Sequence, residues 1–197
     1  MEKININPNS PPELIFEQML ANNKLYQQST ANSSDISATR RTETARDGQA
    51  PYAAVLTCAD SRVAPEHIFM AGVGELFSVR SAGNTVGAEA LGSIEYAVGH
   101  LGVRLIIVMG HSHCGAVVAA MNQNQPTGDS ALSQLIAHIH NNIASADDET
   151  AAVRLNIENE ISNLSKSPEL AADQSSGRIL IRGVIYDIAS GEIEPVS

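Results

Sequence analysis

The apolar run VRLIIVM at residues 103–109, followed at once by GHSHCGAV at residues 110–117, is the clearest indication of the fold class. Its residues show almost no polar alternation, which is typical of a strand buried on both faces of a parallel sheet. The residues that follow, with two histidines and a cysteine, begin a helix. A buried strand leading directly into a helix indicates an α/β protein.

The flanking sequence continues this alternation. Two more β-like runs, PYAAVLT (51–57) and ELFSVR (75–80), precede AEALGSIEYAVGHL (88–101), which has apolar residues at helical spacing. The segment 177–196 predicts a strand, a turn at Ser190–Gly191 and a final short strand. We therefore expect a mostly parallel sheet of four strands plus a short antiparallel edge strand, with helices on both faces. Further helices are predicted over 13–28, after Cys114, and over 130–145 and 151–164.

The length of 197 residues suits one domain with one sizeable core. Residues 1–50 are predicted to form an N-terminal helical arm followed by a polar wrap, and residues 51–197 the α/β domain that carries the chemistry. Within the first part, residues 29–50 are rich in Ser, Thr and Arg and show no apolar period.

Composition excludes several classes of function. A net charge of −10 argues against nucleic-acid binding, which needs a basic face. No segment reaches the roughly 18–20 apolar residues that span a bilayer, so no membrane partner is expected. The first residues, MEKININPNSPPELIF, lack the pattern of a signal peptide. With only two cysteines, the chain is expected to be cytoplasmic, with both thiols reduced.

Chemistry-bearing residues follow two of the predicted strands. Cys58, Asp60 and Arg62 come directly after the run 51–57, and His111 and Cys114 come directly after the run 103–109. Because parallel strands end at one edge of their sheet, these groups can converge there. Cysteine and histidine are zinc ligands, and three of them leave a fourth position for water or a carboxylate.

Other interpretations remain open at this level. A buried cysteine at a strand end can be a small apolar filler. One cysteine could instead be a nucleophile served by His111 or His113, although that leaves the other cysteine unexplained. As a zinc ligand, His113 competes equally with His111.

The stretches CADSRVAPE (58–66) and GHSHCGAV (110–117) resemble the C-x-D-x-R and H-x-x-C motifs of the β-class carbonic anhydrases. The similarity covers most of the chain, including four further stretches: GQAP (48–51), GELFSVRSAGN (74–84), GSIEYAVGHLGV (92–103) and RGVIYDIASG (182–191). The resemblance implies one Zn²⁺ per chain, bound by Cys58, His111 and Cys114, with His113 outside the ligand set.

The resemblance further implies reversible hydration of CO2 to bicarbonate and a proton, through attack of hydroxide activated by zinc. Asp60 and Arg62 are expected to be the catalytic pair, with Arg62 holding the carboxylate in a two-pronged contact. Should that contact break, Asp60 could become the fourth zinc ligand and close the site.

Substrate-binding residues and oligomeric state also follow from the resemblance. Some groups of the family's site come from a neighbouring subunit, so a homo-oligomer is expected, either a dimer or a tetramer of dimers. The residues implied to bind CO2 or bicarbonate are Gln49, Phe77, Ala82, Gly83 and Tyr96.

Two alternative functions are kept. Relatives on the same scaffold hydrolyse carbonyl sulfide or carbon disulfide with the same metal ligands. A zinc-binding structural or sensor module is a third interpretation, but it would not need Asp60, Arg62 and Gln49 together.

Overall fold

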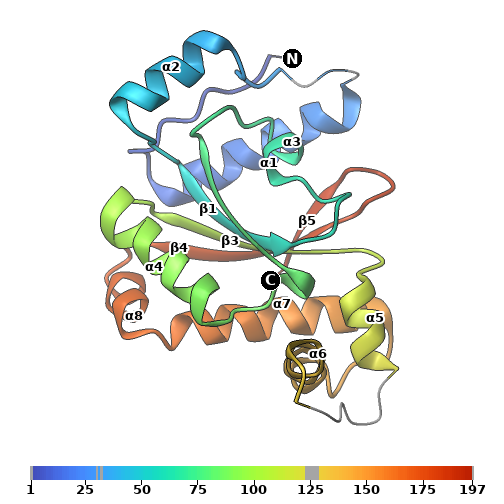
Figure 1. Ribbon diagram of the computed structural model, residues 1–197. Coiled ribbons are helices and arrows are strands. Elements are labelled where there is room, and N and C mark those ends of the chain that lie inside the picture. The colour runs from blue at the N-terminus through green and yellow to red at the C-terminus, as the bar shows by residue number, and fades with distance from the viewer. Residues whose placement is uncertain (1, 30, 32, 123–128, 197) are drawn as a thin grey trace.

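The chain folds around a five-stranded sheet, described by a computed structural model over residues 2–29, 31, 33–122 and 129–196 (Figure 1). The strands lie in the order β2-β1-β3-β4-β5. All neighbouring pairs are parallel except the antiparallel pair β4–β5, as the sequence predicted. The strands are β1 (Ala53–Cys58), β2 (Leu76–Ser81), β3 (Leu105–His111), β4 (Leu180–Tyr186) and β5 (Ile193–Val196).

Strands β1 and β3 form the centre of the sheet, and every residue of both is buried. This burial explains why their sequences lack polar alternation. Thr57 of β1 pairs with Met109 of β3, and Cys58 pairs with Ser81 at the end of β2. The register therefore brings the carboxyl ends of three strands to one edge of the sheet.

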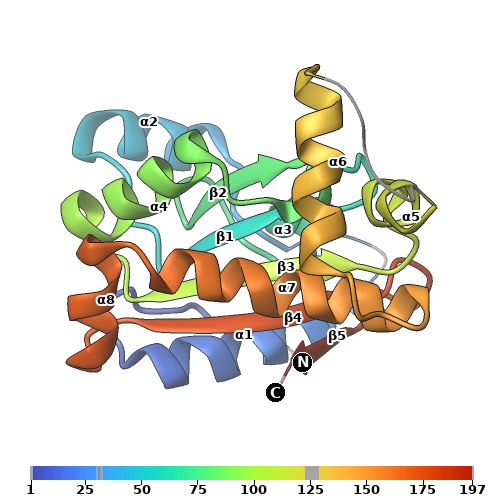
Figure 2. The same ribbon diagram turned by 90° about the horizontal axis from the view of Figure 1, so that it is seen from below.

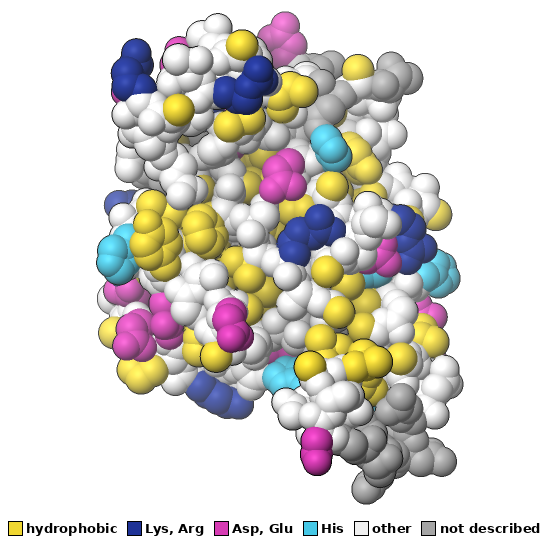
Figure 3. Space-filling view, in the orientation of Figure 1, with side chains coloured by type: hydrophobic (Ala, Val, Ile, Leu, Met, Phe, Trp, Pro, Cys, Tyr) yellow, Lys and Arg dark blue, Asp and Glu magenta, His cyan; other side chains and the backbone are white. Residues whose placement is uncertain are grey.

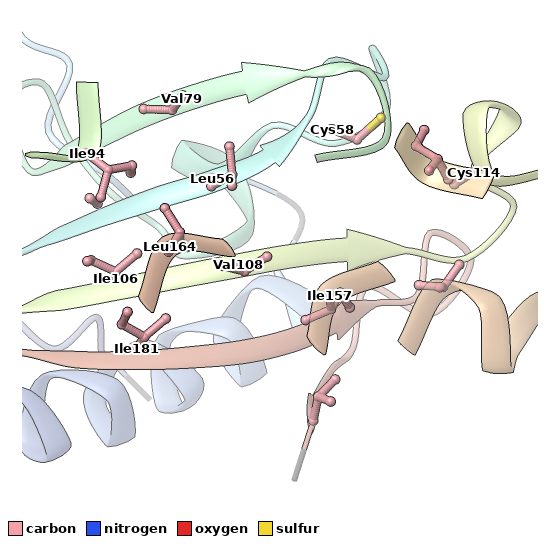
Figure 4. Packing of buried hydrophobic residues seen from close by; sticks show 14 of the residues in the cluster. Leu56, Cys58, Val79, Ile94, Ile106, Val108, Cys114, Ile157, Leu164 and Ile181 are labelled. Atoms are coloured by element: carbon pink, nitrogen blue, oxygen red, sulfur yellow. The ribbon is translucent and has the colours of Figure 1, made fainter. Parts of the chain in front are cut away.

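Helices α4 (Ala88–Leu101), α7 (Glu149–Ser165) and α8 (Pro168–Ser175) cover one face of the sheet (Figure 2). Helices α5 (Gly115–Met121) and α6 (Ala131–Asn142) pack beside α7 near the carboxyl edge. Figure 4 shows the core between these helices and the sheet, in which apolar side chains of β1 and β3 meet those of α4 and α7. Leu56, Ile94 and Ile157 are among its fully buried members.

Helices α1 (Pro12–Gln28) and α3 (Pro65–Ile68) cover the opposite face. Ile15 and Met19 of α1 are fully buried there. The buried side chain of Asn23 donates to the carbonyls of Ile68 and Gly191 and accepts from the backbone of Ile193. These bonds fasten α1 to the turn before β5, so the predicted N-terminal helix packs on the sheet of its own chain.

Helix α2 (Ala38–Asp47) lies inside the segment for which no helix was predicted. None of its residues is buried, so it has no apolar period that the sequence could have revealed. Its start is fixed locally, because the Ser37 side chain accepts a hydrogen bond from the backbone of Arg40. Short helices α3 and α8 were also not predicted.

Within the described part of the chain, none of the helices combines the length and the apolar character that crossing a membrane requires.

Candidate metal centre

Three potential metal ligands converge at the carboxyl edge of the sheet. Cys58 ends β1, His111 ends β3, and Cys114 is the N-cap residue of α5. One ligand atom of each lies within 4.8 Å of the others, and all three residues are buried. The convergence predicted from the strand ends is thus confirmed. Figure 4 shows Cys58 at the end of β1 and labels Cys114 on the neighbouring segment that begins α5.

The donor set fits zinc. The ring of His111 donates from Nδ1 to the Ser112 carbonyl at 2.9 Å, which leaves Nε2 as the atom with a free lone pair. That Nε2 is buried and has no hydrogen-bond partner among the residues that the structure describes. A buried polar atom left in this way costs about 1–3 kcal/mol. Coordination to Zn²⁺ removes this cost, and two thiolates with one imidazole are a common zinc-binding set.

The choice between the two histidines is settled by their surroundings. His111 is fully buried within the cluster, whereas the His113 side chain is 76% exposed. His113 faces Glu149, with 3.5 Å between its Nδ1 and Oε1 of the glutamate. The backbone of His113 has a positive φ of 58°, which turns the chain between His111 and Cys114. His111 is therefore the ligand.

The cysteine thiols are electrostatically prepared for a cation. A hydrogen bond from Cys114 lowers the pKa of Cys58 to about 4, against the opposing effect of burial. The same bond, together with burial, raises the pKa of Cys114. Hydrogen bonding between the two sulfurs thus favours ionisation of Cys58 over Cys114, and a cation bound between them would favour ionisation of both. The backbone N–H of Gly83 also donates to Sγ of Cys58 at 3.3 Å.

Asp60 and Arg62 form a two-pronged ion pair beside the cluster. Arg62 donates from Nε to Oδ1 at 2.9 Å and from Nη2 to Oδ2 at 2.7 Å. Its backbone N–H donates to the same Oδ1. The guanidinium holds the pKa of the Asp60 carboxyl well below its usual range. Arg62 also reaches the carbonyl of His113 at 3.3 Å, so it links the two ligand-bearing loops.

Sequence reasoning missed the contribution of Arg80, which lies near the end of β2. Its guanidinium donates to the carbonyl of Cys58 at 3.2 Å and to that of Asp60 at 2.7 Å. Both bonds hold the backbone of the loop that carries the ligand and the ion pair. Arg80 pairs with Thr57, one residue before the ends of β1 and β2. Pairing of the two predicted strands would therefore have placed Arg80 next to the loop that follows Cys58.

The predicted substrate residues do not all gather at this cluster. Ala82 and Gly83 lie beside it in the 3₁₀ turn Ala82–Asn84, whereas Gln49 is exposed before β1. Phe77 and Tyr96 form a separate ring pair, with centroids 6.2 Å apart. Tyr96 is 46% exposed, and its ring stacks on His100. Figure 3 shows hydrophobic side chains gathered over α4 on this side of the molecule.

Comparisons with known proteins agree on one family. The family described as carbonic anhydrase matches residues 53–193. A carbonic anhydrase from Pseudomonas aeruginosa is 39% identical over 163 residues, which cover 74% of this chain and 73% of that one. A carbonic anhydrase from Synechococcus elongatus is 34% identical over 168 residues, 76% of this chain. The match spans 61% of the length of the Synechococcus protein, less than two thirds.

Among solved structures, the tetrameric beta-carbonic anhydrases of the ascomycete Sordaria macrospora include a chain similar to this one. The TM-score is 0.72 at 25% identity, and the superposition covers 92% of this chain and 96% of the other.

Proposed function

Because this chain belongs to the β-class carbonic anhydrase family, we propose that it catalyses the reversible hydration of CO2 to bicarbonate and a proton. The observation that carries the proposal is the convergence of Cys58, His111 and Cys114 beside a carboxylate held by arginine. A purely structural zinc site closes with four protein ligands and needs no such pair.

Cys58, His111 and Cys114 would hold Zn²⁺, which would supply Lewis acidity and make hydroxide available from water near neutral pH. The chain supplies what surrounds that water. His111 is fixed in one tautomer by Ser112, and Cys58 is fixed by the backbone of Gly83. The site therefore keeps its ligand atoms oriented without help from the substrate.

Asp60 is assigned the role of orienting the attacking oxygen. As an ionised carboxylate it can only accept hydrogen bonds, so it would accept one from the attacking oxygen and orient that oxygen's lone pair toward CO2. Arg62 keeps Asp60 ionised and occupies both carboxylate oxygens, which prevents the carboxylate from moving onto the metal. The geometry of the pair supports an open resting state.

Phe77 is too distant to serve the cluster of its own chain. It lies four residues before Ser81, the partner of Cys58, and thus about 13 Å away along the strand at ~3.3 Å per residue. Tyr96 lies against Phe77 and is half exposed. We assign these two rings and Gln49 to the CO2 pocket of a neighbouring subunit, with Ala82 and Gly83 in the chain's own pocket.

This assignment requires a homo-oligomer built on dimers, and the tetrameric state of the Sordaria structures supports it. It is tested by mixing Arg62→Ala and Tyr96→Ala, two variants each expected to lack activity, after dissociation and reassociation. Shared sites produce hybrids with one intact site, so activity returns on mixing. If the activity of the mixture does not exceed the sum of the activities of the two variants, shared sites are contradicted.

The proposed location is the cytoplasm. Both cysteines are unpaired in the structure, and a reducing compartment keeps them available for the metal.

The function is tested with the purified, zinc-loaded chain in two parallel assays. Stopped-flow measurement of proton release follows CO2 hydration, and sulfide release follows hydrolysis of carbonyl sulfide. Rapid CO2 hydration with little sulfide release supports the proposal. The reverse preference assigns the chain to carbonyl sulfide hydrolysis. If neither assay detects activity, the site is a zinc-binding structural or sensor module.

A further inference from the structure

Glu160 is a fully buried carboxylate in the middle of α7. Its Oε1 accepts from His138 Nε2 at 2.6 Å and from Asn142 Nδ2 at 2.9 Å. Its Oε2 accepts from the backbone N–H of Val86 and from Asn163 Nδ2, both at 3.1 Å. Burying an unpaired carboxylate is costly, so four donors around one side chain mark a site at which this charge is accommodated.

Two arms connect this carboxylate to one short segment, residues 83–86. The direct arm is the hydrogen bond from Val86 to Oε2. The longer arm starts at Asn142, whose Nδ2 bonds both Glu160 and Oδ1 of Asn156. Asn156, itself 1% exposed, then donates to the carbonyl of Gly83 at 2.8 Å. Glu160 thus holds both ends of the segment.

The segment has little freedom at Gly83. The φ of Gly83 is +65°, and an added Cβ would lie 2.6 Å from Cδ1 of Ile139 on α6. On its other side, the Gly83 N–H donates to Sγ of Cys58. Since Asn142 and Ile139 both belong to α6, the Glu160 carboxylate joins α6, α7 and the segment 83–86 into one support behind the Cys58 sulfur.

We propose that Glu160 is a positioning residue of the metal centre, fixing the Gly83 N–H against the Cys58 thiolate through Val86 and through the Asn142–Asn156 arm. This inference rests on the proposed zinc function. A hydrogen bond to a ligand atom holds that atom in the orientation that the metal needs, and its loss weakens metal binding. Glu160 therefore sets zinc affinity from a position that contacts none of the three ligands.

The test is Glu160→Gln, which keeps the shape but replaces one oxygen by NH₂. Whichever way the amide turns, its NH₂ faces existing N–H donors, so one arm is broken. Zinc affinity is measured by competition with a chromogenic chelator, and the thiolate-to-metal charge-transfer band is recorded for the Co²⁺-substituted protein. We expect zinc affinity to fall by about 10-fold or more, with a shifted Co²⁺ band.

Glu158→Gln is the matched control, because Glu158 is exposed on the same helix. It should leave zinc affinity and the Co²⁺ spectrum unchanged. Wild-type affinity and spectrum in a folded Glu160→Gln protein overturn the inference, even if its melting temperature falls, because a merely structural residue changes stability alone.

If Glu160→Gln does not fold, Asn142→Ala takes its place. Asn142 is half-buried in the last turn of α6, and its loss cuts only the longer arm. Zinc affinity reduced severalfold supports the inference, and unchanged affinity overturns it. Failure of the wild-type protein to bind one zinc removes the proposed function and this inference together, whereas tight zinc binding that is indifferent to both variants removes this inference alone.

Discussion

Arg62 holds Asp60 through two parallel hydrogen bonds of 2.9 and 2.7 Å, while its Nη2 also reaches the carbonyl of His113. The Asp60 side chain is 18% exposed, whereas that of Arg62 is 51% exposed. A surface ion pair of this kind contributes little to stability. The role proposed for it is to hold the carboxylate beside the loop that carries His111 and Cys114.

Arg62→Ala should separate catalysis from metal binding. Without its partner, the Asp60 carboxylate is free beside a cation and becomes a competing ligand. CO2 hydration is expected to fall by roughly 100-fold or more, with zinc content unchanged by metal analysis. Arg46→Ala is the control, since Arg46 forms a similar two-pronged pair with Asp47 on the exposed helix α2. Near-normal turnover in Arg62→Ala would refute the assigned role.

The two histidines should behave oppositely on substitution. His111→Ala removes the buried Nε2 and is expected to abolish tight zinc binding, as are Cys58→Ser and Cys114→Ser. His113→Ala should keep the metal, because the ring lies against Glu149 and is exposed. Zinc stoichiometry after dialysis measures this. Loss of zinc from His113→Ala but not from His111→Ala contradicts the ligand assignment.

Gly83→Ala tests the tight approach behind Cys58. Its positive φ and the 2.6 Å approach to Ile139 predict a loss of about 1–3 kcal/mol in the free energy of unfolding. Gly99→Ala is the comparison, because Gly99 lies within α4 with no atom within 4 Å of an added Cβ. Urea unfolding of both proteins should show destabilisation only at Gly83. Equal free energies of unfolding for the two variants would contradict this prediction, because they would show that the segment 83–86 accommodates the added methyl group without strain.

The pair His138–Glu160 should make stability depend on pH. The hydrogen bond to Glu160 raises the pKa of His138 above its usual value, despite opposing desolvation. Protonated His138 therefore stabilises the folded chain fully below the unfolded pKa of about 6.5. This contribution disappears as pH rises through the raised folded pKa.

Replacing His138 by Gln checks this sign. The stability difference between wild type and variant should be larger at pH 5.5 than at pH 8.5, by about 1 kcal/mol or less because the imidazole is 35% exposed. A stability difference that grows with pH would contradict the assignment of a protonated His138 beside an ionised Glu160.

Sequence patterns predicted those features that depend on the spacing of residues close together in the chain. The unbroken apolar run before His111 indicated a central strand, and ligands placed directly after strand ends converged because parallel strands share an edge. The side chains of Asp60 and Arg62, two residues apart, needed only a turn to meet.

Features that depend on tertiary contacts were not predicted. Glu160 resembles any solvated glutamate of a polar helix, and only packing of α6 on α7 buries it. Helix α2 has no buried face, so its sequence lacks the helical spacing of apolar residues that would have predicted it. The separation of Phe77 and Tyr96 from the cluster follows from the register between β1 and β2. The sequence pattern did not predict that register.

Titration of the metal-free protein with Zn²⁺ shows whether zinc held by Cys58, His111 and Cys114 makes this chain a carbonic anhydrase. The rate of CO2 hydration is measured after each addition. We expect the rate to rise linearly and to stop rising at one zinc per chain, and we expect no rise at all in Cys114→Ser. Full zinc binding without hydration, or hydration by the metal-free chain, would contradict this expectation.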